Sequence, residues 1–187
     1  MLKKSIFPAL VAFMFIIQGC SSEKADTTED ANSIIATNKY ILTSLENKQY
    51  TVTKEVNNFI LDGAEGKVVI FDIFATWCPP CQASASHLSS LQEKYKDDLI
   101  VIGATVEDNI ANAKLQEFAK KYNATYTIVN SSENRRFVDA VAASLRLGDR
   151  FPIPILAMYK DGVLINHYVG AIQEEFVESD IKKALGK

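Results

Sequence analysis

The chain has 187 residues, 48% of them hydrophobic and 23% charged, with a formal net charge of −3 at pH 7. This length and apolar content can form the core of one domain and leave residues for a tether. The lack of a basic excess argues against nucleic acid as a partner. Three cysteines are too few for a framework of structural disulfides.

The N-terminal segment has the features of a targeting signal. Two lysines at positions 3 and 4 precede an apolar run over residues 6–17, which is too short to span a bilayer comfortably. The following Ile17-Gln18-Gly19-Cys20 resembles a bacterial lipobox, whose cysteine is acylated and becomes the first residue of the mature protein. An uncleaved N-terminal anchor and an ordinary signal peptide are the alternatives. We expect residues 1–19 to be a lipoprotein signal peptide and Cys20 to be the lipidation site.

Residues 20–38 are polar and acidic, with one small apolar pair. Such a composition predicts a flexible tether that lifts a folded domain, residues 39–187, off a membrane. The expected location is the bacterial periplasm or cell envelope. Ser21 gives no acidic retention signal after the lipid-bearing cysteine, which favours the outer membrane under the enterobacterial pattern.

Two elements are expected before the first buried strand. Residues 40–43 and 49–53 alternate in polarity on either side of Glu46-Asn47-Lys48, which predicts an N-terminal β-hairpin. The stretch that follows, up to Gly66, is interpreted as a connection or a short helix. Residues 68–75 are almost wholly apolar except for Asp72, which predicts a strand buried on both faces of a sheet.

The sequence Trp77-Cys78-Pro79-Pro80-Cys81 lies where this strand runs into a helix. Apolar residues at positions 88, 91 and 95 recur at helical spacing, so Cys78 is expected at the helix N-terminus and Cys81 in its first turn. A C-x-x-C in this place can exchange two electrons by forming and breaking the disulfide Cys78–Cys81.

The two sulfurs are expected to have different roles. Partial positive charge and free N–H groups at the helix N-terminus stabilise a thiolate, so Cys78 is the predicted attacking sulfur. Cys81, one turn further in and more covered, is the predicted resolving sulfur. Pro79 and Pro80 lack N–H donors and no histidine separates the cysteines, so the thiolate is only moderately stabilised. We therefore place the pair near the reducing end of the range of about −270 to about −120 mV.

The remaining pattern alternates strands with helices and then ends in a hairpin and a helix. Asp161-Gly162 between two apolar runs is a strong hairpin signal. The whole order predicts a mixed sheet covered on both faces. The expected strands cover residues 99–106, 124–129, 155–160 and 163–169. The expected helices cover residues 110–122, 135–147 and 174–185. Ser131, Ser132 and Glu133 are the candidate N-caps of the second helix. The predicted inward residues are Leu115, Phe118 and Ala119 on the first of these helices, and Phe137, Val138, Val141 and Leu145 on the second.

Three segments, residues 71–81, 153–162 and 168–171, resemble the thioredoxin superfamily. The predicted hairpin and lipobox point to its periplasmic TlpA/ResA/CcmG (DsbE)-like branch. The resemblance covers about residues 40–187. It implies an α/β, thioredoxin-like fold: a central mixed β-sheet flanked by helices, with an added N-terminal β-hairpin.

The resemblance also implies a structural role for Pro154. This proline would form a cis peptide bond, pack against Cys78 and leave the backbone of Ile153 open to pair with an extended substrate segment. It would also keep a metal ion away from the sulfurs. Pro152 is the rival candidate for the cis bond.

Asp72 matches the buried acid of thioredoxins near the second cysteine. Burial raises a carboxyl pKa, so Asp72 could accept the proton of Cys81; the alternative is an edge-facing acid with access to water. Gly103 stands where thioredoxins often carry a lysine partner to this acid, which puts an ion-paired relay in doubt. Glu107 is a second candidate acid nearby, whose side the sequence leaves open.

Other residues carry weaker signals. Trp77 is expected to shield the sulfurs and offer a flat apolar contact, with plain core packing as the alternative. Pro79, Ile153 and Gly170 complete the expected substrate-binding set. His87 and His167 are interpreted as ordinary surface or core residues. The arginines are interpreted as solvated rather than as an anion site; they are Arg135, Arg136, Arg146 and Arg150. No metal site or cofactor is expected.

These features predict a membrane-tethered thiol–disulfide oxidoreductase that reduces disulfides of exported proteins by Cys78 attack and Cys81 resolution. Family analogy suggests a membrane electron donor of the DsbD/CcdA kind. The suggested clients are apocytochrome c haem-site cysteines or mis-oxidised secreted proteins. One alternative is a disulfide oxidase or isomerase. Another is a copper-binding chaperone lipoprotein, although such sites require C-x-x-x-C and a placed histidine.

Overall fold

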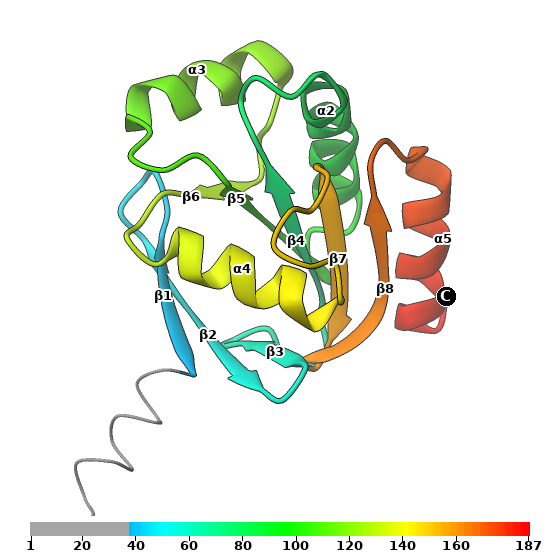
Figure 1. The fold of residues 1–187 in the computed structure, drawn as a ribbon. Helices are drawn as coiled ribbons and strands as arrows, with labels where there is room; N and C mark the ends of the chain where they lie inside the picture. Colours follow the sequence, from blue (N-terminus) through cyan, green and yellow to red (C-terminus); the bar gives the residue numbers. More distant parts are fainter. Residues whose placement is uncertain (1–37) are drawn as a thin grey trace, which may run out of the picture.

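A computed structural model of the chain describes residues 38–187, which form two β-sheets and four helices (Figure 1). The predicted signal peptide, the lipidation site Cys20 and almost all of the predicted tether lie outside the described residues, so these assignments stay predictions. Within the described residues, none of the helices has the length and hydropathy that a bilayer span requires.

A five-stranded mixed sheet with the strand order β6-β5-β4-β7-β8 forms the centre of the molecule. Its middle strand, β4 (Val68–Phe74), is buried at every position. On one side β4 pairs in parallel with β5 (Leu99–Thr105), which pairs in parallel with β6 (Thr127–Val129). On the other side it pairs antiparallel with β7 (Ile155–Lys160), which forms a hairpin with β8 (Val163–Val169). The predicted mixed sheet is therefore confirmed.

Helices cover one face of this sheet. They are α2 (Pro79–Lys94), α3 (Asn112–Tyr122) and α5 (Glu174–Leu185). From β4, the side chains of Val68, Ile70 and Phe74 pack against them in one buried cluster. Because side chains alternate along a strand, Asp72 lies on this same helical face.

The opposite face is covered by α4 (Asn134–Ser144) and by the N-terminal strands. As predicted, Phe137, Val138, Val141 and Leu145 are buried there. Among the predicted caps, Glu133 is the N-cap residue, but its side chain makes no capping hydrogen bond. Instead the Asn134 side chain fixes the start of the helix, since its Nδ2 donates to the Val129 carbonyl at 2.8 Å.

The N-terminal strands form a separate antiparallel sheet with the order β1-β2-β3. The predicted hairpin is confirmed as β1 (Lys39–Thr43) and β2 (Gln49–Glu55). The interpretation of the next stretch as a connection or short helix is wrong, because β3 (Asn58–Leu61) pairs with β2. The turn between them holds Val56 at φ 57°, a left-handed conformation that is unusual for a β-branched residue. Burial of Phe59 and Leu61 stabilises this strand.

Several predicted bounds shift. The strand expected over 124–129 is limited to β6, the helix expected from residue 110 begins at Asn112, and the helix expected up to residue 147 ends at Ser144. Leu115 and Phe118 are buried on α3 as predicted, and Ala119 is partly buried. The bounds of β7, β8 and α5 agree with the sequence analysis.

Candidate active site

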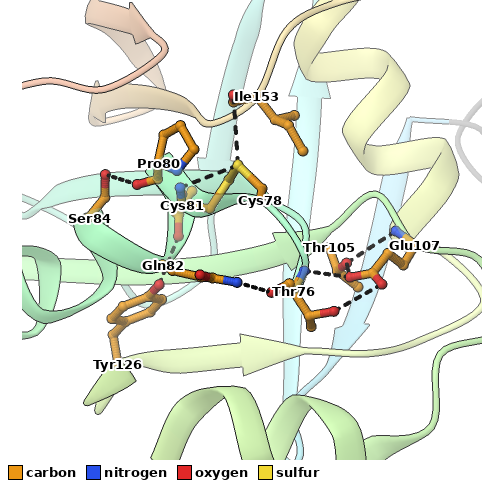
Figure 2. Close-up of a disulfide and its surroundings, with 11 residues drawn as sticks. Thr76, Cys78, Pro80, Cys81, Gln82, Ser84, Thr105, Glu107, Tyr126 and Ile153 are labelled. Carbon is orange, nitrogen blue, oxygen red and sulfur yellow. Dashed lines mark hydrogen bonds between the residues drawn. A yellow bond between two sulfur atoms is a disulfide. The ribbon is translucent and has the colours of Figure 1, made fainter. Parts of the chain in front are cut away.

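The C-x-x-C motif lies at the junction between β4 and α2, as predicted. Cys78 is the N-cap residue of α2, with φ −85° and ψ 110°, and prolines occupy the first two helical positions. The Cys81 backbone N–H donates to Cys78 Sγ over 3.3 Å. The two sulfurs form a disulfide with a Cα–Cα distance of 5.2 Å (Figure 2). The sulfur of Cys78 thus lies at the positive end of the helix dipole, where one N–H faces it.

The two cysteines are covered to the same extent. Each is only 3% exposed, so the expectation that Cys81 is more covered than Cys78 is wrong. The reason is the segment before β7, which places the Ile153 carbonyl oxygen 3.9 Å from Cys78 Sγ. Core packing of Trp77 is also excluded, because this side chain is 66% exposed. Pro79 beside it is exposed as well.

The peptide bond between Ile153 and Pro154 is cis, as the family resemblance implied, and the rival Pro152 forms no cis bond. Pro154 is buried, whereas Ile153 is half-buried. The Pro154 carbonyl accepts a hydrogen bond from the Gly170 backbone N–H at 2.8 Å. The Gly170 amide is therefore used inside the protein, and this contact joins the end of β8 to the segment beside Cys78.

Asp72 is a buried acid and not an edge-facing one, since it is 3% exposed on the central strand. Burial raises its pKa to about 7, while a hydrogen bond from Tyr126 opposes this shift. The Tyr126 hydroxyl donates to Asp72 Oδ2 at 2.8 Å, and Oδ1 has no hydrogen-bond partner. Burial and the neighbouring carboxylate together raise the pKa of Tyr126 well above its ordinary value.

Tyr126 was not among the residues identified from the sequence. It precedes β6 and belongs to the same buried cluster as Cys81. Figure 2 shows its hydroxyl at the end of the ring nearest Cys81. The one sequence signal for such a residue was Gly103, which stands where the family resemblance would place a lysine partner of Asp72. A buried acid without that lysine requires another polar partner.

Glu107 follows β5 and holds the segment that leads into the motif. Its carboxylate accepts hydrogen bonds from the Thr76 backbone N–H at 2.6 Å and the Thr76 hydroxyl at 3.0 Å. A third bond comes from the Thr105 hydroxyl at 3.3 Å. From α2, Gln82 Nε2 donates to the Thr76 carbonyl at 2.8 Å (Figure 2). Thr76, next to Trp77, is thus fixed from two sides, which the sequence did not reveal.

The weaker candidates lie away from this arrangement. His87 is exposed on α2 and His167 is half-buried on β8. Arg135 forms a surface ion pair with Asp139, and Arg136 pairs with Glu133. Arg146 and Arg150 are exposed. No three His, Cys, Asp or Glu side chains within residues 38–187 are grouped so that they could hold a metal ion.

Taken together, the site is a cysteine pair at a helix N-terminus, with an exposed apolar rim and a buried carboxyl group on the strand beneath. Such a pair can accept or donate two electrons by thiol–disulfide exchange. The carboxyl group, whose pKa lies near neutrality, can exchange a proton in the same pH range. This combination is suited to redox chemistry on another disulfide.

Comparison with known families agrees with this chemistry. The family model described as Redoxin matches residues 27–185. The chain is 25% identical over 143 residues to the thiol-disulfide oxidoreductase ResA of Bacillus thuringiensis subsp. konkukian, covering 71% of this chain and 78% of the relative. It is 29% identical over 85 residues to Thioredoxin-1 of Drosophila melanogaster, covering 44% of this chain and 74% of the relative.

Two solved structures share the fold. One is a thioredoxin family thiol:disulfide interchange protein from Chlorobium tepidum, with a TM-score of 0.61 and 18% identity, covering 80% of this chain and 94% of that chain. The other is a secreted Mycobacterium tuberculosis disulfide oxidoreductase homologous to DsbE of E. coli, with a TM-score of 0.55 and 19% identity, covering 79% and 98%. The expected thioredoxin-like α/β fold is therefore confirmed, and β3 extends the predicted N-terminal hairpin to a three-stranded sheet.

Proposed function

The chain belongs to the redoxin family within the thioredoxin superfamily, and from this premise we propose that it is a membrane-tethered reductant of disulfides in exported proteins. Its activity class is that of a thiol–disulfide oxidoreductase of the ResA/DsbE type. The observation that carries the proposal is the position of Cys78 at the N-cap of α2, where the Cys81 N–H faces its sulfur.

In the first step, the Cys78 thiolate attacks one sulfur of a client disulfide. A bond forms between Cys78 Sγ and that sulfur, the client S–S bond breaks, and the other client sulfur leaves as a thiolate that takes a proton from water. The helix N-terminus stabilises the Cys78 thiolate before the attack. The two prolines at the start of α2 supply no further N–H donors, which limits this stabilisation.

In the second step, Cys81 resolves the mixed disulfide. Asp72 accepts the Cys81 proton, and the Cys81 thiolate attacks Cys78 Sγ. The bond to the client breaks, the client leaves with both sulfurs reduced, and the disulfide between Cys78 and Cys81 remains. The buried position of Asp72 on the α2 face and its pKa near 7 support this role, because a base with such a pKa is ready at neutral pH.

The client binds at the rim around Cys78. Trp77 and Pro79 are exposed and offer an apolar contact for a client segment. The Ile153 carbonyl beside Cys78 Sγ is placed to accept a backbone hydrogen bond from an extended chain. Gly170 contributes through its bond to the Pro154 carbonyl, which holds this rim in place.

The moderate stabilisation of the Cys78 thiolate supports the proposed direction of electron flow, from this protein to its clients. A dithiol whose thiolate is only moderately stabilised donates electrons readily, and in an oxidising compartment it requires a dedicated donor. We propose that a membrane protein of the DsbD/CcdA kind supplies the electrons. The chain itself is anchored in a bacterial envelope through acylated Cys20, and its clients include apocytochrome c. The alternative with the same cysteines is an oxidase or isomerase, which would rest in the disulfide form.

The direction is tested by trapping free thiols with an alkylating agent in intact cells that carry the full chain. We expect Cys78 and Cys81 to be modified, which shows that the pair rests reduced. A fully oxidised resting pair would overturn the assignment as a reductant and favour the oxidase.

The activity is tested on the purified full chain with insulin as the disulfide substrate and dithiothreitol as the electron source. Cys78→Ser should abolish the acceleration of insulin reduction, whereas Cys81→Ala should accumulate mixed disulfides with clients in cells. Cys20→Ser is the matched control, because it should lose membrane association and keep the activity. Activity that survives Cys78→Ser would contradict the mechanism.

A further inference from the structure

Gly103 leaves a gap in the sheet next to the buried acid. It lies directly opposite Asp72 in the register of β4 and β5, and its backbone does not adopt the left-handed conformation that favours glycine. A Cβ atom at this position would lie 2.9 Å from Tyr126 Cε2 and 3.2 Å from Phe74 Cε1. Position 103 therefore requires glycine because a side chain would collide with these rings, and not because of its backbone conformation.

The Tyr126 ring occupies this gap. Since the strand order is β6-β5-β4, a residue next to β6 must cross β5 to reach Asp72 on β4. Tyr126 does so over Gly103, and its hydroxyl donates to Asp72 Oδ2 at 2.8 Å. Both side chains are almost completely buried, so water cannot readily replace this hydrogen bond.

We propose that Tyr126, crossing the sheet over Gly103, is a positioning residue for Asp72, occupying Oδ2 and leaving Oδ1 as the atom that accepts the Cys81 proton. The inference rests on the proposed function, in which Asp72 is the base of the resolving step. Oδ1 is buried and has no hydrogen-bond partner, so its lone pairs are available to accept a proton. In the reaction, the Cys81 S–H bond breaks, the proton goes to Oδ1, and the electron pair stays on sulfur for the attack on Cys78.

The surroundings of Asp72 leave Tyr126 as its main polar partner. In the β-sheet register the neighbours of Asp72 are Gly103 on β5 and Leu156 on β7, neither of which is titratable. From α2 the titratable group in the same cluster is Cys81. Helix α3 adds the partly buried Tyr122 beside apolar side chains, and α5 contributes apolar side chains only. Burial raises the pKa of Asp72, and only the Tyr126 hydrogen bond lowers it. Removing the hydroxyl should therefore raise that pKa further.

The test separates the two sulfur steps with 5,5′-dithiobis(2-nitrobenzoate) as the substrate of the reduced full chain. Cys78 attack releases the first thionitrobenzoate, and Cys81 resolution releases the second. In Tyr126→Phe, which keeps the ring, the pH midpoint of the second phase should move up by about one unit, as expected for the loss of a hydrogen bond to a charged group. The first phase should not change. A residue with a purely structural role would not move this midpoint.

Tyr122→Phe is the matched control, since Tyr122 packs partly against the same cluster from α3. Its second phase should keep the wild-type midpoint. An unshifted midpoint in Tyr126→Phe, with two clear phases in both proteins, overturns the positioning role and leaves the proposed function intact. A wild-type protein without a second phase contradicts the proposed resolving step itself.

Gly103→Ala tests the gap. The added Cβ should displace the Tyr126 ring and shift the midpoint in the same direction as Tyr126→Phe. In the Tyr126→Phe background, Gly103→Ala should add little further shift, because the hydrogen bond is already absent. Equal shifts in both backgrounds would show that Gly103 acts independently of Tyr126. Should Gly103→Ala fail to fold, the Tyr126→Phe result decides alone.

Discussion

The two faces of the central sheet differ in what they bury. On the face of α4 and the N-terminal strands, five aromatic rings pack against one another, those of Tyr40, Phe59, Phe71, Phe137 and Tyr159. On the face of α2, α3 and α5, the buried set includes both cysteines and the pair of Asp72 and Tyr126. One face is a tightly packed aromatic core, whereas the other contains the chemistry.

A single strand supplies both faces. Along β4, Phe71 and Ile73 point into the aromatic cluster, while Asp72 between them points toward the active-site helix. Because the period of a strand is two residues, stability and reactivity are assigned to alternate positions of the same segment. Substitutions on the two faces should therefore separate stability from redox chemistry.

The largest expected effect lies on the aromatic face. Phe137→Ala removes a fully buried ring that contacts three other rings, and should lower the free energy of unfolding by about 3–5 kcal/mol. Denaturant titration of the oxidised protein measures this loss. The exposed Phe176→Ala is the control, with an expected change within about 0.5 kcal/mol. A changed reduction potential in folded Phe137→Ala would show that the two faces are not separate.

The next effect concerns Asp72 and depends on pH. Burial raises the pKa of Asp72 in the folded state to about 7, above its unfolded value, so the native state binds the proton more tightly. The resulting stability is complete below about pH 4 and is lost as the pH rises to about 7. In Asp72→Asn no buried carboxyl group has to ionise. Above pH 7 the free energy of unfolding of the variant should therefore exceed that of the wild type, by at most about 4 kcal/mol.

Denaturant titrations of the oxidised proteins at acid and alkaline pH measure this difference. Asp62→Asn, at an exposed acid, is the control and should leave the pH dependence of the wild type unchanged. If the free energy of unfolding depends on pH in the same way in the wild type and in Asp72→Asn, ionisation of the buried carboxyl group does not destabilise the folded state as expected.

A smaller effect is expected where Glu107 holds the segment before Trp77. Glu107→Gln replaces a carboxylate that accepts from both the N–H and the hydroxyl of Thr76, and should cost about 1–2 kcal/mol of stability. It should also slow the attack by Cys78, measured with a small disulfide. The neighbouring Asp108→Asn, which is exposed, should change neither quantity. An unaltered attack rate would show that fixing Thr76 is unimportant for the sulfur.

The smallest effect on stability is expected at Trp77. Because this side chain is 66% exposed, Trp77→Ala should change the free energy of unfolding by less than about 0.5 kcal/mol. It should lower kcat/KM for a protein client by about fivefold, the effect of losing about 1 kcal/mol of contact. The reduction of a small disulfide serves as the internal control and should stay the same. An equal loss on both substrates would point to shielding of the sulfurs instead of client contact.

The sequence predicted the elements whose signals are local. The apolar run of β4, the Asp161-Gly162 turn and the helical spacing after Cys81 identified the central strand, the hairpin and α2, because each depends on neighbours within a few residues. The third N-terminal strand was missed because its turn places Val56 in a left-handed conformation that no local pattern indicates. Equal cover of the two cysteines also escaped prediction, since it depends on Ile153, 75 residues after Cys78.

The sequence by itself identified the candidate redox pair, two cysteines at the start of a helix, and an acid on the strand before it. Tertiary structure alone decided how that acid is held. Tyr126 is 54 residues from Asp72 and Glu107 is 31 residues from Thr76, and these contacts exist only because the strand order places β4, β5 and β6 side by side. The alternation of polar and apolar residues in the sequence indicates which face of the sheet a side chain occupies. Only the pairing of the strands determines which side chain of another strand it contacts.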